Sequence, residues 1–453
     1  MRYLVPPLLA LAVVVGVQAY NSVQSRGAPE APVVADALAR QPGVADPVPL
    51  TEVPPAVAVD TADIDRRIDF WQGRAADHPQ SEQEWIYIGD LLDLKGRLTG
   101  DVGEYIAAQK AYERAIEIAP NSLSAHSGNA RLLATLHDFE NAVAEATRVL
   151  QIDPYANDAL GVIFDSSIEL GELDNAQLAL ERLAERVQTP ALFIRQARLS
   201  FFTGDTKSAI DFARQAVAYA EAEQVSPAVM AFYHFAVGEY QLFGGNPDAA
   251  AAEFEIALQA LPGYPAAIYG QSRVAFANGD VDAAIATLES LPKSLARPDM
   301  WAFLGDLYQL AGNASAAAEL YALADQAAQT AAVGERLIFG REYALFLADH
   351  DQRLEFALTL AEPATGSVAD GYGADSLAWV LYKADRPQEA LAAARTALEY
   401  GIPDPLIRIH AGLIEIAAGD PEDGRALIEE ALALHPTASP LVIQEARDAL
   451  AAL

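Results

Sequence analysis

Apolar residues recur along the chain at the spacing of amphipathic helices, and small residues among them recur at a longer period. The first stripe, Ile64, Ile68 and Trp71, has the spacing i, i+4, i+7 and predicts a helix that starts near Thr61. Small residues then recur about every 34 residues, with small slips and one longer gap. They are Ala108, Ala142, Ala176, Ala209, Ala250, Ala284, Ala317, Ala390 and Gly424. This long period predicts an array of similar helical units.

A glycine turn separates the two helices that the pattern predicts in most units. The turn lies five residues before the recurring small residue, as Gly171-Glu172, Gly204-Asp205, Gly245-Asn246, Gly279-Asp280, Gly312-Asn313 and Gly419-Asp420. Glycine accepts the left-handed conformation that ends one helix, and Asp or Asn can cap the next. His137 takes this turn position in the second unit. Small residues also recur on the first helices and predict close helix approach, although Phe164 departs from this rule.

One unit contains a motif that is specific to a known family. Residues 301–308, from Trp301 to Tyr308, spell W-x2-L-G-x2-Y, and Ala317 and Tyr321 follow with the spacing of the second half of that pattern. The motif resembles the tetratricopeptide repeat family. The resemblance implies an all-α fold over residues 61–453, a right-handed α-solenoid of stacked antiparallel helix pairs with about ten repeats and a terminal capping helix.

Several units depart from the regular length. We expect an inserted loop at residues 96–104 and a long second helix over residues 205–225. The eighth unit is degenerate, and residues 363–373 are expected to loop out after it. Ser439 and Pro440 are expected to form the N-cap and first turn of the terminal helix.

The amino terminus has the pattern of an export signal. Arg2 precedes an apolar run at residues 4–17, and Val17-Gln18-Ala19 has small residues at both cleavage-determining positions. We expect residues 1–19 to be a signal peptide cleaved after Ala19, or alternatively a retained membrane anchor. Prolines among Ala and Val predict a disordered linker over residues 20–60. In both cases the repeats lie outside the cytoplasm, in the periplasm or the extracellular space.

Composition narrows the classes of partner and chemistry. The chain has 30 Lys and Arg against 63 Asp and Glu, a formal charge of −33, so its surface repels nucleic acid and anionic membranes. We therefore expect no nucleic-acid partner, and membrane contact only through an uncleaved amino-terminal segment. The chain contains no cysteine, which excludes disulfides and thiolate chemistry.

The sequence contains no complete catalytic motif of a known enzyme class. The histidines include no pair at chelating spacing. Ser290-Leu291-Pro292-Lys293 and Gly371-Tyr372-Gly373 match fragments of catalytic and nucleotide-binding motifs, but both lack the rest of those motifs and are predicted to be loops. We expect a chain that is not an enzyme, with no catalytic residues, no cofactor and no metal.

In the tetratricopeptide family the first helix of each unit lines a concave groove, and this rule predicts the partner-binding residues. Aromatic residues on that face are Phe201, Phe235, Tyr269, Phe276, Trp379 and Tyr382, and charged residues there include Arg131, Arg198, Glu239 and Arg273. The rings offer rigid contact area to a protein or peptide partner, or they only fill gaps between stacked helices.

One groove position alternates in charge through six successive units. Its residues are Arg131, Asp165, Arg198, Glu239, Arg273 and Asp306. This alternation predicts a ladder of exposed ion pairs along the groove, and hence a largely uncharged partner segment. In the alternative interpretation, the three arginines bind an acidic partner.

A second resemblance bears on the biological setting. Residues 377–382, from Leu377 to Tyr382, together with Glu389-Ala390 and His410-Ala411-Gly412, are similar to a group of exported bacterial tetratricopeptide proteins. The resemblance implies binding and scaffolding and no particular activity. The sequence thus predicts a non-catalytic adaptor in the bacterial cell envelope. Alternatives are a scaffold for envelope polysaccharide or outer-membrane assembly machinery, a structural spacer, or a carbohydrate-active or transferase enzyme fused to repeats.

Overall fold

The computed structural model describes residues 61–99, 101–292, 295–333, 336–362 and 370–453. The predicted signal peptide and linker lie outside these residues. The first helices of successive pairs are α4 (Glu82–Thr99), α6 (Leu123–Thr135), α8 (Asn157–Glu169), α10 (Pro190–Phe202), α12 (Pro227–Phe243), α14 (Pro265–Ala277), α16 (Pro298–Leu310), α18 (Gly340–Asp349), α20 (Gly371–Lys383) and α22 (Pro405–Ala418).

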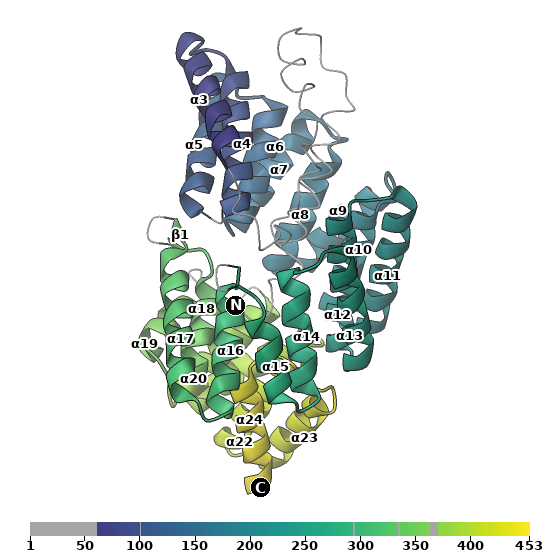
Figure 1. The fold of residues 1–453 in the computed structure, drawn as a ribbon, viewed down its shortest axis with the longest axis vertical. Coiled ribbons are helices and arrows are strands. Elements are labelled where there is room, and N and C mark those ends of the chain that lie inside the picture. Colours follow the sequence, from purple (N-terminus) through teal and green to yellow (C-terminus); the bar gives the residue numbers. More distant parts are fainter. Residues whose placement is uncertain (1–60, 100, 293–294, 334–335, 363–369) are drawn as a thin grey trace.

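The second helices complete the pairs. They are α5 (Val102–Ile118), α7 (Phe139–Ile152), α9 (Leu173–Ala184), α11 (Thr206–Glu223), α13 (Pro247–Ala260), α15 (Val281–Glu289), α17 (Ala314–Thr330), α19 (Leu354–Ala361), α21 (Pro387–Glu399) and α23 (Pro421–Leu432). Single helices, α3 (Ala62–Asp77) and α24 (Pro440–Ala452), lie at the two ends (Figure 1). A short antiparallel pair of strands, β1 (Ala332–Val333) and β2 (Arg336–Leu337), precedes α18.

Each first helix packs against its own second helix, and each second helix packs against the first helix of the next pair, so that consecutive pairs stack. The predicted all-α solenoid of stacked helix pairs is therefore confirmed. The purple helices at one end of Figure 1 are the first pairs, and the yellow helices at the other end are α22, α23 and α24.

The turns between paired helices have the backbone that the sequence predicts. The turn glycines adopt positive φ, from 71° to 104°, at Gly171, Gly204, Gly245, Gly279, Gly312 and Gly419. His137 adopts the same left-handed conformation with a φ of 56°. The Asp205 carboxylate accepts a 2.9 Å hydrogen bond from the backbone N–H of Ser208 and so caps α11, whose predicted extra length is confirmed.

Glycines on the first helices let aromatic rings lie between neighbouring helices. An added Cβ would lie 2.4 Å from the Phe254 ring at Gly238 and 2.6 Å from it at Gly270. The ring of Phe254 on α13 therefore packs between α12 and α14 and joins two successive pairs. Phe164, the residue that departs from the small-residue rule, is fully buried in α8.

The expected loop at residues 96–104 is wrong. α4 extends to Thr99, and the insertion lengthens this helix instead. Gly96 is buried inside the added turn, where it faces the ring of Tyr105 on α5. The longer hairpin buries more apolar surface, which favours a helix over an exposed loop.

Two expectations near the carboxyl terminus also need correction. Gly371 begins α20 and does not belong to a loop, because the Asp370 carboxylate accepts a 2.8 Å hydrogen bond from the Gly373 N–H and caps the helix. The rest of that expected loop, residues 363–369, lies outside the described residues. Ser439 precedes α24 as expected, but its φ of 51° prevents it from capping the helix with its side chain.

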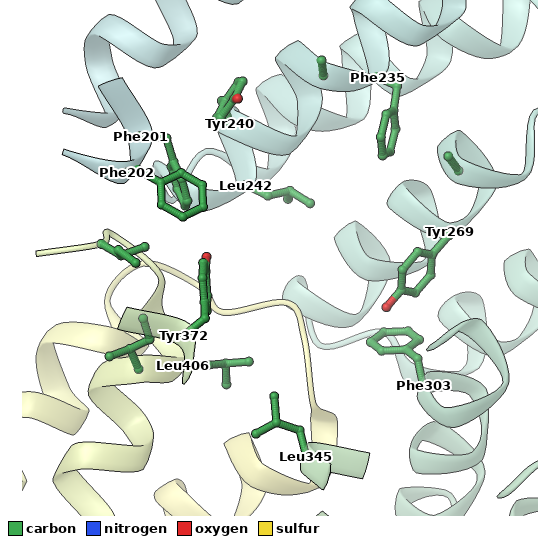
Figure 2. Close-up of a cluster of buried hydrophobic side chains, with 14 of the residues drawn as sticks. Phe201, Phe202, Phe235, Tyr240, Leu242, Tyr269, Phe303, Leu345, Tyr372 and Leu406 are labelled. Carbon is green, nitrogen blue, oxygen red and sulfur yellow. The ribbon is translucent and has the colours of Figure 1, made fainter. Parts of the chain in front are cut away.

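The array curves until its C-terminal pairs contact its middle pairs. Phe202 on α10 faces Tyr372 on α20, with ring centroids 5.9 Å apart (Figure 2). One hydrophobic cluster consequently extends from Leu160 to Ala446, whereas much of the core of α3 to α7 forms smaller separate clusters. The inner face of the middle repeats is thereby covered by the molecule itself.

Candidate peptide-binding groove

The first repeats leave a partly exposed stripe on a first helix. α6 lies between α4 and α8. Ser127, Arg131 and Thr135 are spaced by one helical turn on α6 and are partly exposed. The guanidinium of Arg131 interacts electrostatically with Asp90 on α4 and Asp158 on α8. The stripe is therefore polar, and its one cation is balanced by carboxylates on both neighbouring helices.

Farther along the array, a buried ion-pair cluster joins three first helices. Nη2 of Arg195 lies 2.8 Å from Oδ2 of Asp165, and Arg198 pairs with both Asp165 and Glu169. Arg341 belongs to α18, far from α8 in the sequence, and its Nη2 lies 3.6 Å from Oε2 of Glu169. Burial raises the pKa of Glu169 from 4.5 to about 7, because the two guanidinium groups only partly offset the loss of solvation.

A second buried cluster lies between α12, α14 and residues beyond α23. Nη1 of Arg273 lies 2.8 Å from both carboxylate oxygens of Glu239. The guanidinium carbon of Arg273 lies 5.4 Å from the ring centroid of Tyr269, and its Nη2 donates a 3.0 Å hydrogen bond to Oγ1 of Thr437. Asp404 interacts electrostatically with Arg273, and burial raises the pKa of this carboxyl to about 6.

The predicted charge ladder has ion pairs at two of its steps. Nη1 of Arg198 lies 3.7 Å from Oδ1 of Asp165, and Arg273 pairs with Glu239. The expectation that these pairs are exposed is wrong, because the side chains of Arg198 and Arg273 are 0% and 8% exposed. The pairs are buried because later repeats cover this part of the inner face.

The last member of the predicted ladder has a different partner. The carboxylate of Asp306 on α16 lies 2.9 Å from Nε2 of His350 on α18. It also accepts a 3.0 Å hydrogen bond from the hydroxyl of Tyr321. A histidine from the degenerate unit thus occupies the place where the alternation would bring a cation.

The predicted aromatic groove residues of the middle repeats fill gaps between helices. Phe201 packs against Phe243 with centroids 4.6 Å apart, and Phe235 packs against Phe254 at 5.8 Å. Tyr269 and Phe276 both form T-shaped ring pairs with Phe303, with ring centroids 5.3 and 5.9 Å apart. Figure 2 shows Phe201, Phe235 and Tyr269 inside the packed interior.

The two aromatic groove residues of α20 differ in exposure. Trp379 is fully buried, stacks on His410 with centroids 4.1 Å apart, and donates a 2.7 Å hydrogen bond from Nε1 to Asp349. Tyr382 is partly exposed, and its hydroxyl donates a 3.2 Å hydrogen bond to Glu445 on α24. Trp379 therefore serves packing in this structure.

Only two of the predicted groove residues, Arg131 and Tyr382, are partly exposed. The others are buried, namely Arg198, Phe201, Phe235, Glu239, Tyr269, Arg273, Phe276 and Trp379. Their contact with a partner stays a prediction, because in this structure other parts of the chain cover them.

Within the described residues, no group of three or more His, Asp and Glu side chains is placed to hold a metal ion. The helices of this part of the chain include none with both the length and the apolarity needed to cross a membrane.

Comparison with known families agrees with this geometry. Residues 85–157, 244–307 and 376–439 match models described as tetratricopeptide repeats. These segments cover helix pairs from the beginning, the middle and the end of the array. The chain is a tetratricopeptide repeat protein. The fold of this family is generally a non-catalytic interaction module, so the chain is a protein-binding scaffold or adaptor.

Several solved structures are similar to this chain over long stretches. The human IFIT1 dimer with PPP-AAAA is 15% identical with a TM-score of 0.46, over 70% of this chain and 72% of that chain. A tetratricopeptide repeat protein from Parabacteroides merdae is 15% identical with a TM-score of 0.40, over 53% and 93% of the two chains. PilW, a type IV pilus biogenesis factor, is 19% identical with a TM-score of 0.36, over 45% and 92%. At these values the similarities indicate nothing about partner or activity.

Sequence reasoning missed several residues of the tetratricopeptide groove. Glu169 and Arg195 lie about one helical turn from the predicted Asp165 and Arg198 on the same faces, so helical spacing could have included them. Arg341 and residues 434–439 had no such signal, because they reach the inner face only through the curvature of the array.

Proposed function

We propose that this tetratricopeptide repeat protein is an exported, non-catalytic adaptor of the bacterial cell envelope, and that it holds an uncharged protein or peptide segment on the concave face of its first repeats. The observation behind this proposal is the partly exposed stripe of Ser127, Arg131 and Thr135 on α6. The pattern of an export signal at residues 1–19 supports the envelope location.

The chemistry of the stripe suits an uncharged segment. The hydroxyls of Ser127 and Thr135 and the guanidinium of Arg131 can form hydrogen bonds with a peptide backbone. Asp90 and Asp158 already balance the Arg131 charge. A carboxylate-rich partner would face these acids and the chain's net charge of −33.

The test is affinity capture from envelope extract with matched variants of one repeat. Thr135→Arg places a long cation on the partly exposed stripe of α6, whereas Thr147→Arg places the same side chain on the exposed face of α7. We expect the α6 variant to lose a bound protein that the α7 variant and the wild type retain. Thermal unfolding of both variants checks that each is folded. Equal capture by the two variants contradicts binding at the concave face.

A further inference from the structure

Residues 434–439, the C-terminal segment, join α23 to α24 and lie against the middle repeats. The turn after α12 approaches the start of this segment so closely that an added Cβ on Gly245 would lie 3.2 Å from Cα of Leu434. Thr437 accepts the hydrogen bond from Arg273 on α14. α24 then packs against α16 as well as against α22 and α23 (Figure 1). The segment therefore crosses the inner face of α12, α14 and α16.

Two small cavities lie beside the C-terminal segment on this face. A cavity beside Ala438 and Ser439, which Tyr269 and Phe303 also line, has a volume of about 30 Å³. A second cavity beside Pro436 and Arg273 has a volume of about 20 Å³. Each has room for a few water molecules and not for a peptide segment. A partner can thus reach this part of the groove only after the segment leaves it.

The contacts of the C-terminal segment resemble those of a bound peptide. Pro436 lines the second cavity together with the apolar side chains of Leu242, Phe243 and Leu406. The Thr437 hydroxyl is held by Arg273, and both residues are buried. The segment has small, uncharged residues from Pro436 to Ser439. A side-chain pocket and a hydrogen-bond donor are the elements by which a groove recognises an extended ligand.

The backbone of the C-terminal segment is strained. His435 and Ser439 adopt left-handed conformations, with φ of 49° and 51°, which residues other than glycine rarely adopt. Oγ of Ser439 is buried and has no hydrogen-bond partner among the described residues. Strain and an unsatisfied hydroxyl both lower the cost of moving the segment out of the groove.

We propose that the C-terminal segment is an internal ligand, which occupies the inner face of α12, α14 and α16 until a segment of another protein replaces it. The external segment has the same chemistry: it is extended and uncharged, with a proline followed by a hydroxyl residue and a small residue. Glu239 and Asp404 beside Arg273 disfavour a carboxylate at this place. This inference rests on the proposed function, since it assumes that the concave face binds protein segments.

The first experiment locks the segment with a reversible disulfide. In the Gly245→Cys/Leu434→Cys variant an added Cβ at position 245 lies 3.2 Å from Cα of residue 434, within reach of a disulfide, and the chain has no other cysteine. Position 245 has a φ of 73°, so Gly245→Cys is also measured alone to separate strain at this turn from the effect of the disulfide. The probe is a fluorescent peptide with the sequence of residues 433–440, measured by anisotropy. We expect the oxidised variant to bind it at least about tenfold more weakly than the reduced variant. The single cysteine variants, treated with the same oxidant, are the controls.

The second experiment needs no disulfide. Ile443 is fully buried on α24, and Ile443→Ala loosens this helix and so raises the fraction of molecules with an open groove. We expect this variant to bind the probe at least about tenfold more tightly than the wild type. A probe in which threonine is replaced by valine should bind more weakly than the original to the same variant, because it cannot accept the hydrogen bond from Arg273.

The outcomes separate this inference from the proposed function. Equal probe binding by the oxidised and reduced variants, or no probe binding by Ile443→Ala, overturns the internal ligand. The capture experiment with Thr135→Arg and Thr147→Arg concerns α6, outside the covered face. If the two threonine variants still differ while the probe does not bind, only the internal ligand is wrong. If they do not differ while the probe binds as expected, the site on the first repeats is wrong and the internal ligand stands.

Discussion

The Glu169 carboxylate on α8 lies 3.6 Å from the Arg341 guanidinium on α18, so repeats that are distant in sequence share one buried ion-pair cluster. Arg341 also lies 3.1 Å from Asp370 and 3.7 Å from Glu342. The guanidinium of Arg341 thus forms ion pairs with three carboxylates. This sharing explains why burial still raises the pKa of Glu169 to about 7 although Arg198 pairs with it as well.

The raised pKa of Glu169 predicts a pH dependence of stability. The folded state binds the Glu169 proton more tightly than the unfolded state, whose pKa is close to 4.5. Its contribution to the free energy of unfolding is therefore present at low pH and falls as pH rises from about 4.5 to 7. We expect Glu169→Gln to match the wild type near pH 4.5 and to be more stable at pH 8, by roughly 2–3 kcal/mol.

Urea unfolding of both chains at several pH values measures this difference. The wild-type curve alone is not diagnostic, since other carboxyls such as Asp404 titrate in a similar range. If Glu169→Gln is less stable than the wild type at pH 8, the attraction to Arg198 and Arg341 outweighs burial and the sign assigned here is wrong.

A methyl group added between two repeats should lower the free energy of unfolding. Gly270→Ala places a Cβ 2.6 Å from the Phe254 ring, which cannot move far because Gly238 on the other side is equally close. We expect a loss of about 1–3 kcal/mol in the free energy of unfolding. Gly73→Ala on α3 is the matched control, because its Cβ meets nothing within 4 Å, and it should stabilise by about 0.5–1 kcal/mol through helix propensity. Chemical denaturation compares the two, and equal effects would contradict the close packing of Phe254.

Removal of a buried arginine should destabilise the protein more than removal of an exposed one. Arg273→Ala leaves the Glu239 carboxylate, 4% exposed, without its ion-pair partner. We expect it to destabilise the protein by about 3–5 kcal/mol. Arg66→Ala breaks an exposed pair with Asp63 on α3 and should change stability by less than about 1 kcal/mol. Thermal unfolding of the two variants checks this order, and similar shifts would mean that Glu239 finds another partner or enough water.

The terminal helix should act as a cap. Deletion of residues 439–453 removes α24 and uncovers the apolar faces of α16, α22 and α23 that it contacts. We expect a lower melting temperature and self-association, measured by calorimetry and light scattering. A truncated chain that stays monomeric with an unchanged melt shows that α24 is not needed to cover the array.

The amino terminus predicts processing in the native host. Val17-Gln18-Ala19 indicates cleavage after Ala19, so that Tyr20 becomes the first residue. Intact mass or terminal sequencing of protein from the host measures this directly. Recovery of the full-length chain in the membrane fraction supports the retained anchor instead.

The local features of the repeats could be predicted from the sequence because each depends on a few neighbouring residues. The left-handed turn at Gly204, the cap at Asp205 and the long α11 all follow from turn chemistry and helical periodicity. The prediction for residues 96–104 is wrong because Gly96 suggests a loop by its low helix propensity, although it lies inside α4. Burial of Gly96 against Tyr105 outweighed its poor helix propensity.

The sequence alone therefore determined the all-α repeat, the position of the turns and the charges available to the inner face. Only the tertiary structure decided which inner residues face solvent. Small rotations between successive pairs add up until Leu434 meets Gly245 and Thr437 meets Arg273, and no local pattern records that sum. Arg131 remains partly exposed for the same reason that Arg273 is buried: the array curves over its middle repeats and leaves the first ones open.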